Sequence, residues 1–167
     1  MLATLAAIPI LGILAILQSA IFSRMPILHG TADVILLVLI AWALQDRVKN
    51  IWIWTLLGGL IVSYLSALPS IVPMIGYFLA VGFAWWLRRR IWQAPILAMF
   101  LATFVGTLVS QGVTLFSLQL SDNPYPILQS LNLITLPSAL LNLLLALPVY
   151  GIVTDLAKTL YPGEETE

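Results

Sequence analysis

Long apolar stretches separated by short polar gaps fill almost the whole of this chain. The stretch from Ala32 to Leu44 is nearly continuous hydrocarbon, whereas a membrane β-barrel strand alternates apolar and polar residues. About 20 apolar residues suffice for a helix to cross a bilayer. The sequence therefore predicts an all-α membrane protein, with six transmembrane helices in one compact bundle. The six predicted spans are Leu2 to Phe22, Pro26 to Gln45, Ile51 to Leu68, Val72 to Leu87, Pro95 to Leu120, and Leu133 to Val153.

The composition agrees with a membrane location. Hydrophobic residues make up 61% of the 167 residues, charged residues make up 8%, and the mean hydropathy is +1.05. So little charge could not cover the surface of a soluble domain of this size. We expect one transmembrane domain over residues 1–153 and a short cytoplasmic tail over residues 154–167, disordered at its end. The longest predicted loop runs from Ser121 to Asn132.

Basic residues gather in alternate gaps between the predicted spans. Six of the seven Lys and Arg residues lie on one side of the membrane if the chain crosses six times. The positive-inside rule places that side in the cytoplasm, so both termini are predicted to be cytoplasmic and the membrane to be the bacterial inner membrane. The six residues are Arg47, Lys49, Arg88, Arg89, Arg90 and Lys158.

Three of the predicted helices carry small residues at intervals of four, which places them on one helix face. Lipid is as apolar as leucine, so close backbone approach at small residues is what drives helices together in a membrane. Such ridges either pack the bundle internally or face a partner protein, and the sequence leaves both open. The ridge residues are Gly59, Ser63 and Ala67, then Gly76, Ala80 and Ala84, then Ala102, Gly106 and Ser110.

A few polar residues lie inside the predicted spans. Asp33 is an acid within the second span, and His29 precedes it by four residues, which is one helical turn. Acids within spans usually face the bundle interior and are functional. Asp33 and His29 could form a local structural pair, contact a partner protein, or bind a ligand or proton. Asn142 in the last span must find a partner on another helix, and Pro148 is expected to kink that helix near Leu144.

The sequence offers little for catalysis. The chain has no cysteine and one histidine, so a metal site is not expected. No phosphate-binding loop or catalytic triad pattern is present, and the zero net charge gives no support for binding nucleic acid. We therefore expect no enzyme activity and no cofactor. Arg88, Arg89 and Arg90 are interpreted as topology determinants, with contact to lipid headgroups or to a cytoplasmic partner as the alternative.

Three segments resemble MreD, the rod shape-determining membrane protein family of bacteria. They are Ala32-Asp33-Val34-Ile35-Leu36-Leu37, the stretch from Leu68-Pro69-Ser70 through Ile75-Gly76-Tyr77 to the arginine triplet, and the stretch from Pro137 to Tyr150. Family members often carry an acid after a Gly-Leu in the third helix, where this chain has Ser63. The resemblance implies a non-enzymatic scaffold of the peptidoglycan elongation machinery. It would bind MreC, a single-span protein, and through it act on the RodA glycosyltransferase and a class B penicillin-binding transpeptidase.

The main alternative is the substrate-binding S component of an energy-coupling-factor vitamin transporter. Those proteins also have six helices and a similar size, and their fold could be the same as that of the MreD family. They dock their membrane partner through an Ala-rich ridge on the first helix, which Ala3 and Ala7 could imitate. A vitamin site would need a roomy outward pocket with converging polar groups. The outward half of the bundle is therefore what distinguishes the two functions.

Overall fold

In a computed structural model, the described residues are 2–20, 30–91, 93–120 and 126–162. Helices make up 83% of them, and no strand occurs among them. The all-helical prediction is thus confirmed. The helices are α1 (Leu2–Ala20), α2 (Val34–Ala43), α3 (Ile51–Leu65), α4 (Ile71–Arg88), α5 (Pro95–Gln119), α6 (Ile127–Ser130), the π-helix η2 (Leu131–Thr135) and α7 (Leu136–Leu160).

Three of these helical segments are long and apolar enough to cross a membrane. They are α4, α5, and the continuous segment from α6 through η2 to α7. The apolar part of α1 from Thr4 to Ala20, and the helices α2 and α3, are shorter. The length and composition of the three long segments suggest a membrane protein.

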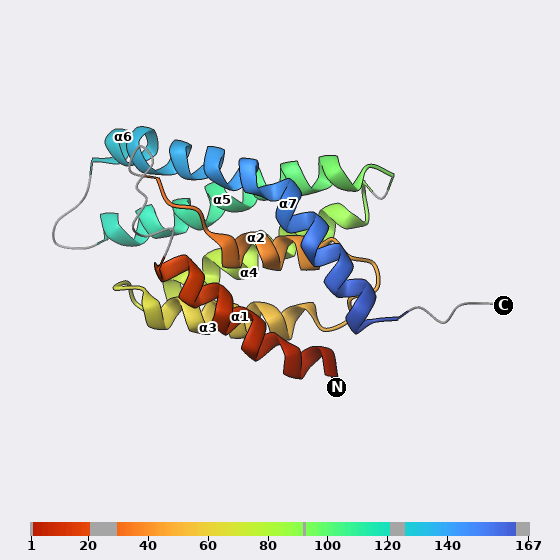
Figure 1. The fold of residues 1–167 in the computed structure, drawn as a ribbon. Coiled ribbons are helices and arrows are strands. Elements are labelled where there is room, and N and C mark those ends of the chain that lie inside the picture. Colours follow the sequence, from red (N-terminus) through yellow and green to blue (C-terminus); the bar gives the residue numbers. More distant parts are fainter. Residues whose placement is uncertain (1, 21–29, 92, 121–125, 163–167) are drawn as a thin grey trace.

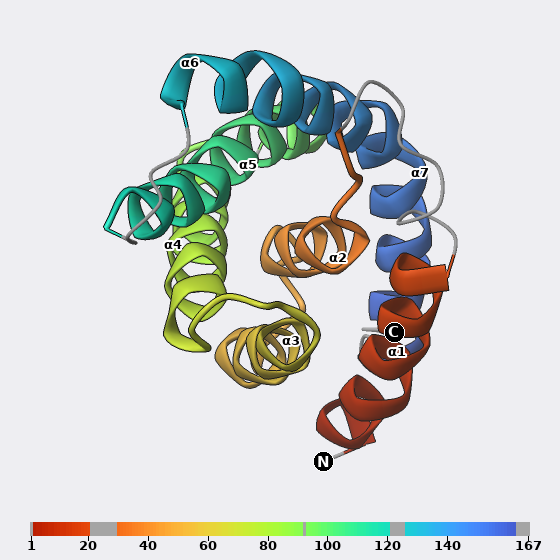
Figure 2. The same ribbon diagram turned by 90° about the vertical axis from the view of Figure 1, so that its left-hand side faces the viewer.

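The short helix α2 lies at the centre of the molecule (Figure 2), and all ten of its residues are buried. The helices α3, α4, α5 and α7 pack around it, and α1 covers α2 and α3 from outside. Successive helices run in opposite directions, so that α1 begins and α7 ends at the same end of the bundle (Figure 1). We call this end the basic end, because α4 finishes there at Arg88 and α7 carries Lys158 there.

The second predicted span differs most from the structure. Helix α2 begins at Val34, and the segment Gly30 to Asp33 before it is not helical. The sequence-based start at Pro26 lies outside the described residues. With 10 residues and a rise of about 1.5 Å per residue, α2 is about 15 Å long, half the thickness of a hydrocarbon core. The hydropathy pattern predicted a full span because it cannot tell an apolar helix from an apolar extended segment.

Other boundaries also shift. Helix α3 ends at Leu65, so Ala67 lies beyond the helix and is exposed rather than on the predicted ridge. The predicted loop from Ser121 to Asn132 is partly helical, since α6 begins at Ile127. Helix α7 continues past Val153 to Leu160, into the segment that was predicted to be a tail. It changes direction along its length (Figure 1), and Pro148 is the proline inside it.

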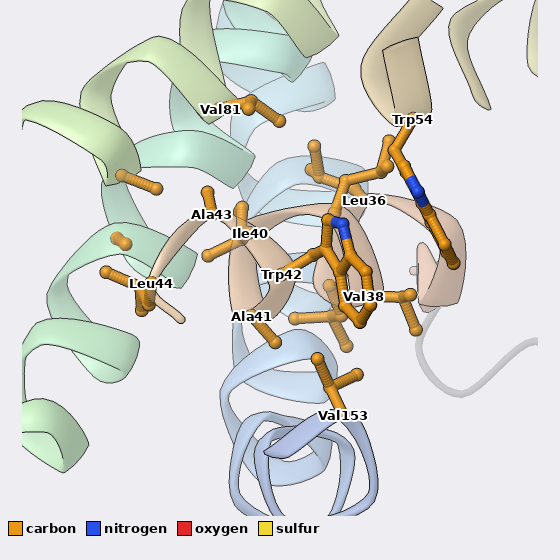
Figure 3. Close-up of a cluster of buried hydrophobic side chains, with 14 of the residues drawn as sticks. Leu36, Val38, Ile40, Ala41, Trp42, Ala43, Leu44, Trp54, Val81 and Val153 are labelled. Carbon is orange, nitrogen blue, oxygen red and sulfur yellow. The ribbon is translucent and has the colours of Figure 1, made fainter. Parts of the chain in front are cut away.

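Large side chains surround α2 near the basic end. The rings of Trp42 and Trp54 stack with centroids 4.2 Å apart, and both side chains are fully buried. Figure 3 shows Val81 of α4 and Val153 of α7 reaching α2 from two further directions. The whole circumference of α2 is therefore apolar and covered, as expected for a helix that lies inside a larger protein.

Helices α4 and α5 pack through their small-residue ridges. A Cβ on Gly106 would lie 3.2 Å from the Cβ of Ala80, and a Cβ on Gly76 would lie 3.1 Å from the Cα of Ser110. The same antiparallel register places Ala84 opposite Ala102, and both are fully buried. The two ridges therefore cover each other. On α3, Gly59 faces Met74 of α4, and the hydroxyl of Ser63 donates to the carbonyl of Ser70 at 2.7 Å.

Candidate functional site

The segment that leads into α2 is held against the start of α7. A Cβ on Gly30 would lie 2.6 Å from the backbone nitrogen of Ser138, so only glycine fits this close approach. The backbone N–H of Thr31 donates to the hydroxyl of Ser138 at 3.1 Å. An extended backbone has no hydrogen bonds of its own, and here a side chain of α7 supplies one.

Asp33 is the N-cap of α2. Its carboxyl group accepts a hydrogen bond from the backbone N–H of Leu36 at 3.0 Å, which satisfies one of the free N–H groups of the first helical turn. The hydroxyl of Tyr77 on α4 lies 2.6 and 2.7 Å from the two carboxyl oxygens. The side-chain amide of Gln18 on α1 donates to the same carboxyl group at 3.4 Å. The acid is therefore a structural centre for three helices.

Two amide side chains complete this polar cluster. Gln18 accepts from the backbone N–H of Ile35 at 3.1 Å, which satisfies another N–H at the start of α2. Asn142 on α7 accepts from the backbone N–H of Asp33 at 2.9 Å and donates to the hydroxyl of Thr107 on α5 at 3.0 Å. The cluster, which we call the Asp33 cluster, joins α1, α2, α4, α5 and α7. Its members are Gln18, Asp33, Tyr77, Thr107, Ser138 and Asn142.

The geometry of the Asp33 cluster suits a structural role. Each of its polar groups named above bonds another part of the chain, so the cluster supplies the start of α2 with the hydrogen bonds that water would otherwise give. Among the described residues no three His, Cys, Asp or Glu side chains come together. The predicted His29 partner of Asp33 lies outside the described residues. The helical turn assumed in that pairing is not present, because Gly30 to Asp33 is not helical.

The other end of α2 is capped by an arginine. The guanidinium group of Arg88 donates to the carbonyl oxygen of Gln45 at 2.7 Å and to that of Ala43 at 3.4 Å, and it lies 3.6 Å from Asp46. A positive charge at a helix C-terminus is favourable because the carbonyl dipoles point toward it. Arg88 is therefore turned inward.

The other two arginines of the triplet remain at the surface. Arg89 lies over the ring of Trp85 at 4.0 Å, and Arg90 lies over Trp86 at 5.6 Å. Both are exposed. Of the three arginines predicted to contact lipid or a partner, Arg89 and Arg90 are therefore the two that are exposed and could make such a contact.

The described residues enclose several cavities. One of about 180 Å³ lies beside Arg88 at the basic end. One of about 240 Å³ lies between α1 and the end of α3 and is lined by Gln18, Val62 and Leu65. Another, of about 310 Å³, lies between the second half of α5 and the η2 segment.

The sequence pointed to only part of the Asp33 cluster. Asp33 and Asn142 stand out as polar residues within apolar stretches, and the structure joins them through the backbone of Asp33. Tyr77 and Thr107 gave no signal, because tyrosine and threonine are common in spanning helices without a specific role. Tyr77 directly follows Gly76, and Thr107 directly follows Gly106. That these positions face the Asp33 cluster can be recognised only once the register of the helices is known.

Comparison of the chain with protein-family models, with curated proteins and with solved structures finds no match. The class that the fold and the site define is an all-helical protein with membrane-length apolar helices and a buried polar cluster.

Proposed function

We propose that this protein is a non-enzymatic scaffold of the bacterial cell-elongation machinery, embedded in the inner membrane by six helices. In this proposal it controls rod shape by binding an MreC-like single-span protein, and through it RodA and a class B penicillin-binding transpeptidase. The segment resemblance to the MreD family supplies the identity of the partners.

The proposal that the scaffold is not an enzyme rests on one observation: the polar groups of the Asp33 cluster are used to hold helices together. The carboxyl group of Asp33 and the amide of Asn142 both bond the first turn of α2 or the segment before it. Tyr77 and Thr107 in turn bond those two side chains. Polar groups occupied in this way hold a helix in place and do not present a nucleophile or a base to a substrate.

The arrangement of the ends supports the proposed orientation. The start of α1 and the end of α7 lie at the basic end (Figure 1), which fits an even number of crossings. Arg88 and Lys158 lie at that end too, and under the positive-inside rule this end faces the cytoplasm.

Two observations favour the scaffold over the S component of a vitamin transporter. Ala7, on the ridge that would dock a transporter subunit, is fully buried inside this bundle. Neither cavity at the end opposite the basic end suits a vitamin. The cavity next to Gln18 measures about 240 Å³, below the range of about 300–1,000 Å³ for small-molecule sites, and the cavity of about 310 Å³ between α5 and η2 has no charged residue in its lining. The side chain of Gln18, which lines the cavity of about 240 Å³, already bonds Asp33 and the N–H of Ile35 at the start of α2.

The test is purification of the tagged full-length protein from its source cells in mild detergent, with mass spectrometry of what stays bound. We expect a single-span protein with a long coiled-coil region outside the membrane. Recovery of two ATPases and a second membrane subunit, or of a bound vitamin, would overturn the proposal in favour of a transporter.

A tagged, unrelated multi-span protein from the same membrane is the control for nonspecific recovery. A second control uses Leu140→Ala, which changes an exposed side chain of α7 that is 66% accessible. This variant should keep its fold. If Leu140→Ala loses the partner while variants on the exposed faces of other helices keep it, the exposed face of α7 is the one that binds the partner.

A further inference from the structure

The cavity between α5 and η2 differs in character from the Asp33 cluster. Its walls are mainly apolar, with Leu115 and Leu118 from α5 and Ile134 from η2, and none of its lining residues is charged. Four polar side chains also line it: Gln111, Thr114, Ser130 and Thr135. We call it the α5–η2 cavity.

Thr135 is the unusual residue of this cavity. Its side chain is 2% exposed, and its hydroxyl has no hydrogen-bond partner among the residues that the structure describes. A threonine in a helix usually bonds the carbonyl three or four residues earlier. Here the π-helical turn, in which the N–H of Leu136 bonds the carbonyl of Leu131, changes that spacing. A buried hydroxyl without a partner destabilises the fold unless something outside the chain satisfies it.

We infer that the α5–η2 cavity holds one acyl chain of a membrane phospholipid, and that the hydroxyl of Thr135 donates to an ester carbonyl of that lipid. This inference rests on the membrane insertion in the proposed function but not on the role in cell elongation. The apolar wall matches a hydrocarbon chain. The hydroxyl donors match an ester carbonyl, whereas the lack of a basic residue excludes recognition of a phosphate inside the cavity.

The position of the cavity fits the depth of lipid esters. Helix α5 has 25 residues and is about 37 Å long, which exceeds the hydrocarbon core of about 30 Å. The last turns of α5 therefore reach the interface, where phospholipid ester groups lie. The cavity is lined by residues of these last turns.

The size of the cavity excludes a partner helix. A helix with its side chains is about 10–12 Å across, far more than a cavity of about 310 Å³ admits. A single unbranched chain fits this volume. Phe116 and Leu128, which lie close in sequence to the lining residues Leu115 and Ser130, are 68% and 73% accessible and would lie against the surrounding lipid.

The experiment uses the full-length protein reconstituted into phosphatidylethanolamine and phosphatidylglycerol vesicles. The vesicles contain a trace of phosphatidylethanolamine with a diazirine in one acyl chain. After illumination, mass spectrometry identifies the labelled residues. We expect labels to concentrate on residues 111–118 and 130–135. Labels spread evenly over the exposed faces of α5 and α7 would overturn the inference.

Two variants sharpen the result. Leu115→Trp fills the cavity and should abolish the concentrated labelling, while the matched change Leu140→Trp on the outer face of α7 should leave it unchanged. Thr135→Val keeps the shape of the side chain and should lower the labelling about fivefold, as expected for the loss of one hydrogen bond. Unchanged labelling in Thr135→Val would overturn the assignment of the carbonyl contact, even if Leu115→Trp fails to fold.

A competition experiment distinguishes a phospholipid from an isoprenoid lipid as the occupant of the cavity. If a diazirine-bearing polyprenyl phosphate displaces the phospholipid probe from these residues, the occupant is an isoprenoid lipid and the inference is overturned. An alkaline wash of the vesicles comes first. Protein removed by the wash contradicts the membrane insertion in the proposed function, whereas inserted protein without cavity labelling contradicts the lipid site alone.

Discussion

The two halves of α5 differ in composition and have opposite surroundings. In the first half, from Pro95 to Gly106, Thr103 is the one polar residue, and Ala98, Ala102 and Gly106 are buried against the rest of the bundle. In the second half, from Gln111 to Gln119, four of the nine residues are polar, no residue is buried, and the α5–η2 cavity opens beside it. Close packing therefore follows the small residues of the first half, and the more polar half is left unpacked.

The difference comes from the lengths of neighbouring helices. Helix α4 has 18 residues and α5 has 25. Gly76 of α4 lies opposite Ser110 in the antiparallel pair. The start of α4 therefore reaches only about one turn past Ser110, and the last turns of α5 have no part of α4 beside them. The shorter helix thus ends the close packing, and the π-helical segment η2 takes its place beside α5.

The largest expected effect is at the packed half. Gly106→Leu places a branched side chain where a single Cβ would already lie 2.8 Å from Ile40 and 3.2 Å from Ala80. Overpacking of this kind typically costs about 1–3 kcal/mol, and the short distances at Gly106 place this variant at the upper end. We expect a large drop in the melting temperature in detergent, together with loss of partner binding. The matched variant Gly112→Leu, in the open half, should keep most of the stability because a Cβ there meets nothing within 4 Å.

A smaller loss is expected where α7 bonds the packed half. Asn142→Leu leaves the N–H of Asp33 and the hydroxyl of Thr107 without their partner, at a cost of about 2 kcal/mol. Asn132→Leu, an exposed asparagine on η2, is the control and should have little effect. Equal unfolding curves in a denaturing-detergent titration for the two variants would show that Asn142 does not stabilise the bundle.

A change at Asp33 tests how the cluster depends on the acid. Asn is as good an N-cap as Asp, so Asp33→Asn should insert normally and lose about 1 kcal/mol through weaker hydrogen bonds to Tyr77. The expected consequence is weaker assembly and poorer control of cell shape. A normal cell shape with unchanged stability would make Asp33 a bystander.

Tyr77→Phe completes a double-mutant cycle with Asp33→Asn. If the two groups act through their mutual hydrogen bond, the double variant should lose clearly less than the sum of the single losses. Additive losses would mean that Tyr77 and Asp33 contribute independently.

The smallest effect, and the only stabilising one, is expected in the open half. Gly112→Ala adds a Cβ into open space and reduces the freedom of the unfolded chain, so it should raise the stability by about 0.5–1 kcal/mol. The same change at Gly106 should lower the stability instead. Opposite shifts in melting temperature would sharpen the contrast between the halves of α5, and shifts of the same sign would contradict it.

Hydropathy predicted an all-helical chain, of which three segments are long and apolar enough to cross a membrane. The spacing of small residues located the residues where α4 meets α5. They could not predict that Gly30 to Asp33 is not helical, because the hydrogen bonds that allow it come from Ser138 and Asn142, more than 100 residues away. The inward turn of Arg88 was missed for a similar reason. Its partners are the carbonyl groups of Ala43 and Gln45, and a backbone carbonyl leaves no trace in the sequence.

The hydrogen bond between Asp33 and Asn142 spans 109 positions of the chain and sets the order in which this protein can be completed during synthesis. When α2 leaves the ribosome, Gln18 and Asp33, which bond N–H groups of its first turn, are already made, but Asn142 is not. The backbone just before α2 therefore lacks its partner until the last helix has been synthesised. The bundle is then completed late, and a shortened chain that stops before Asn142 should be less stable than the full chain.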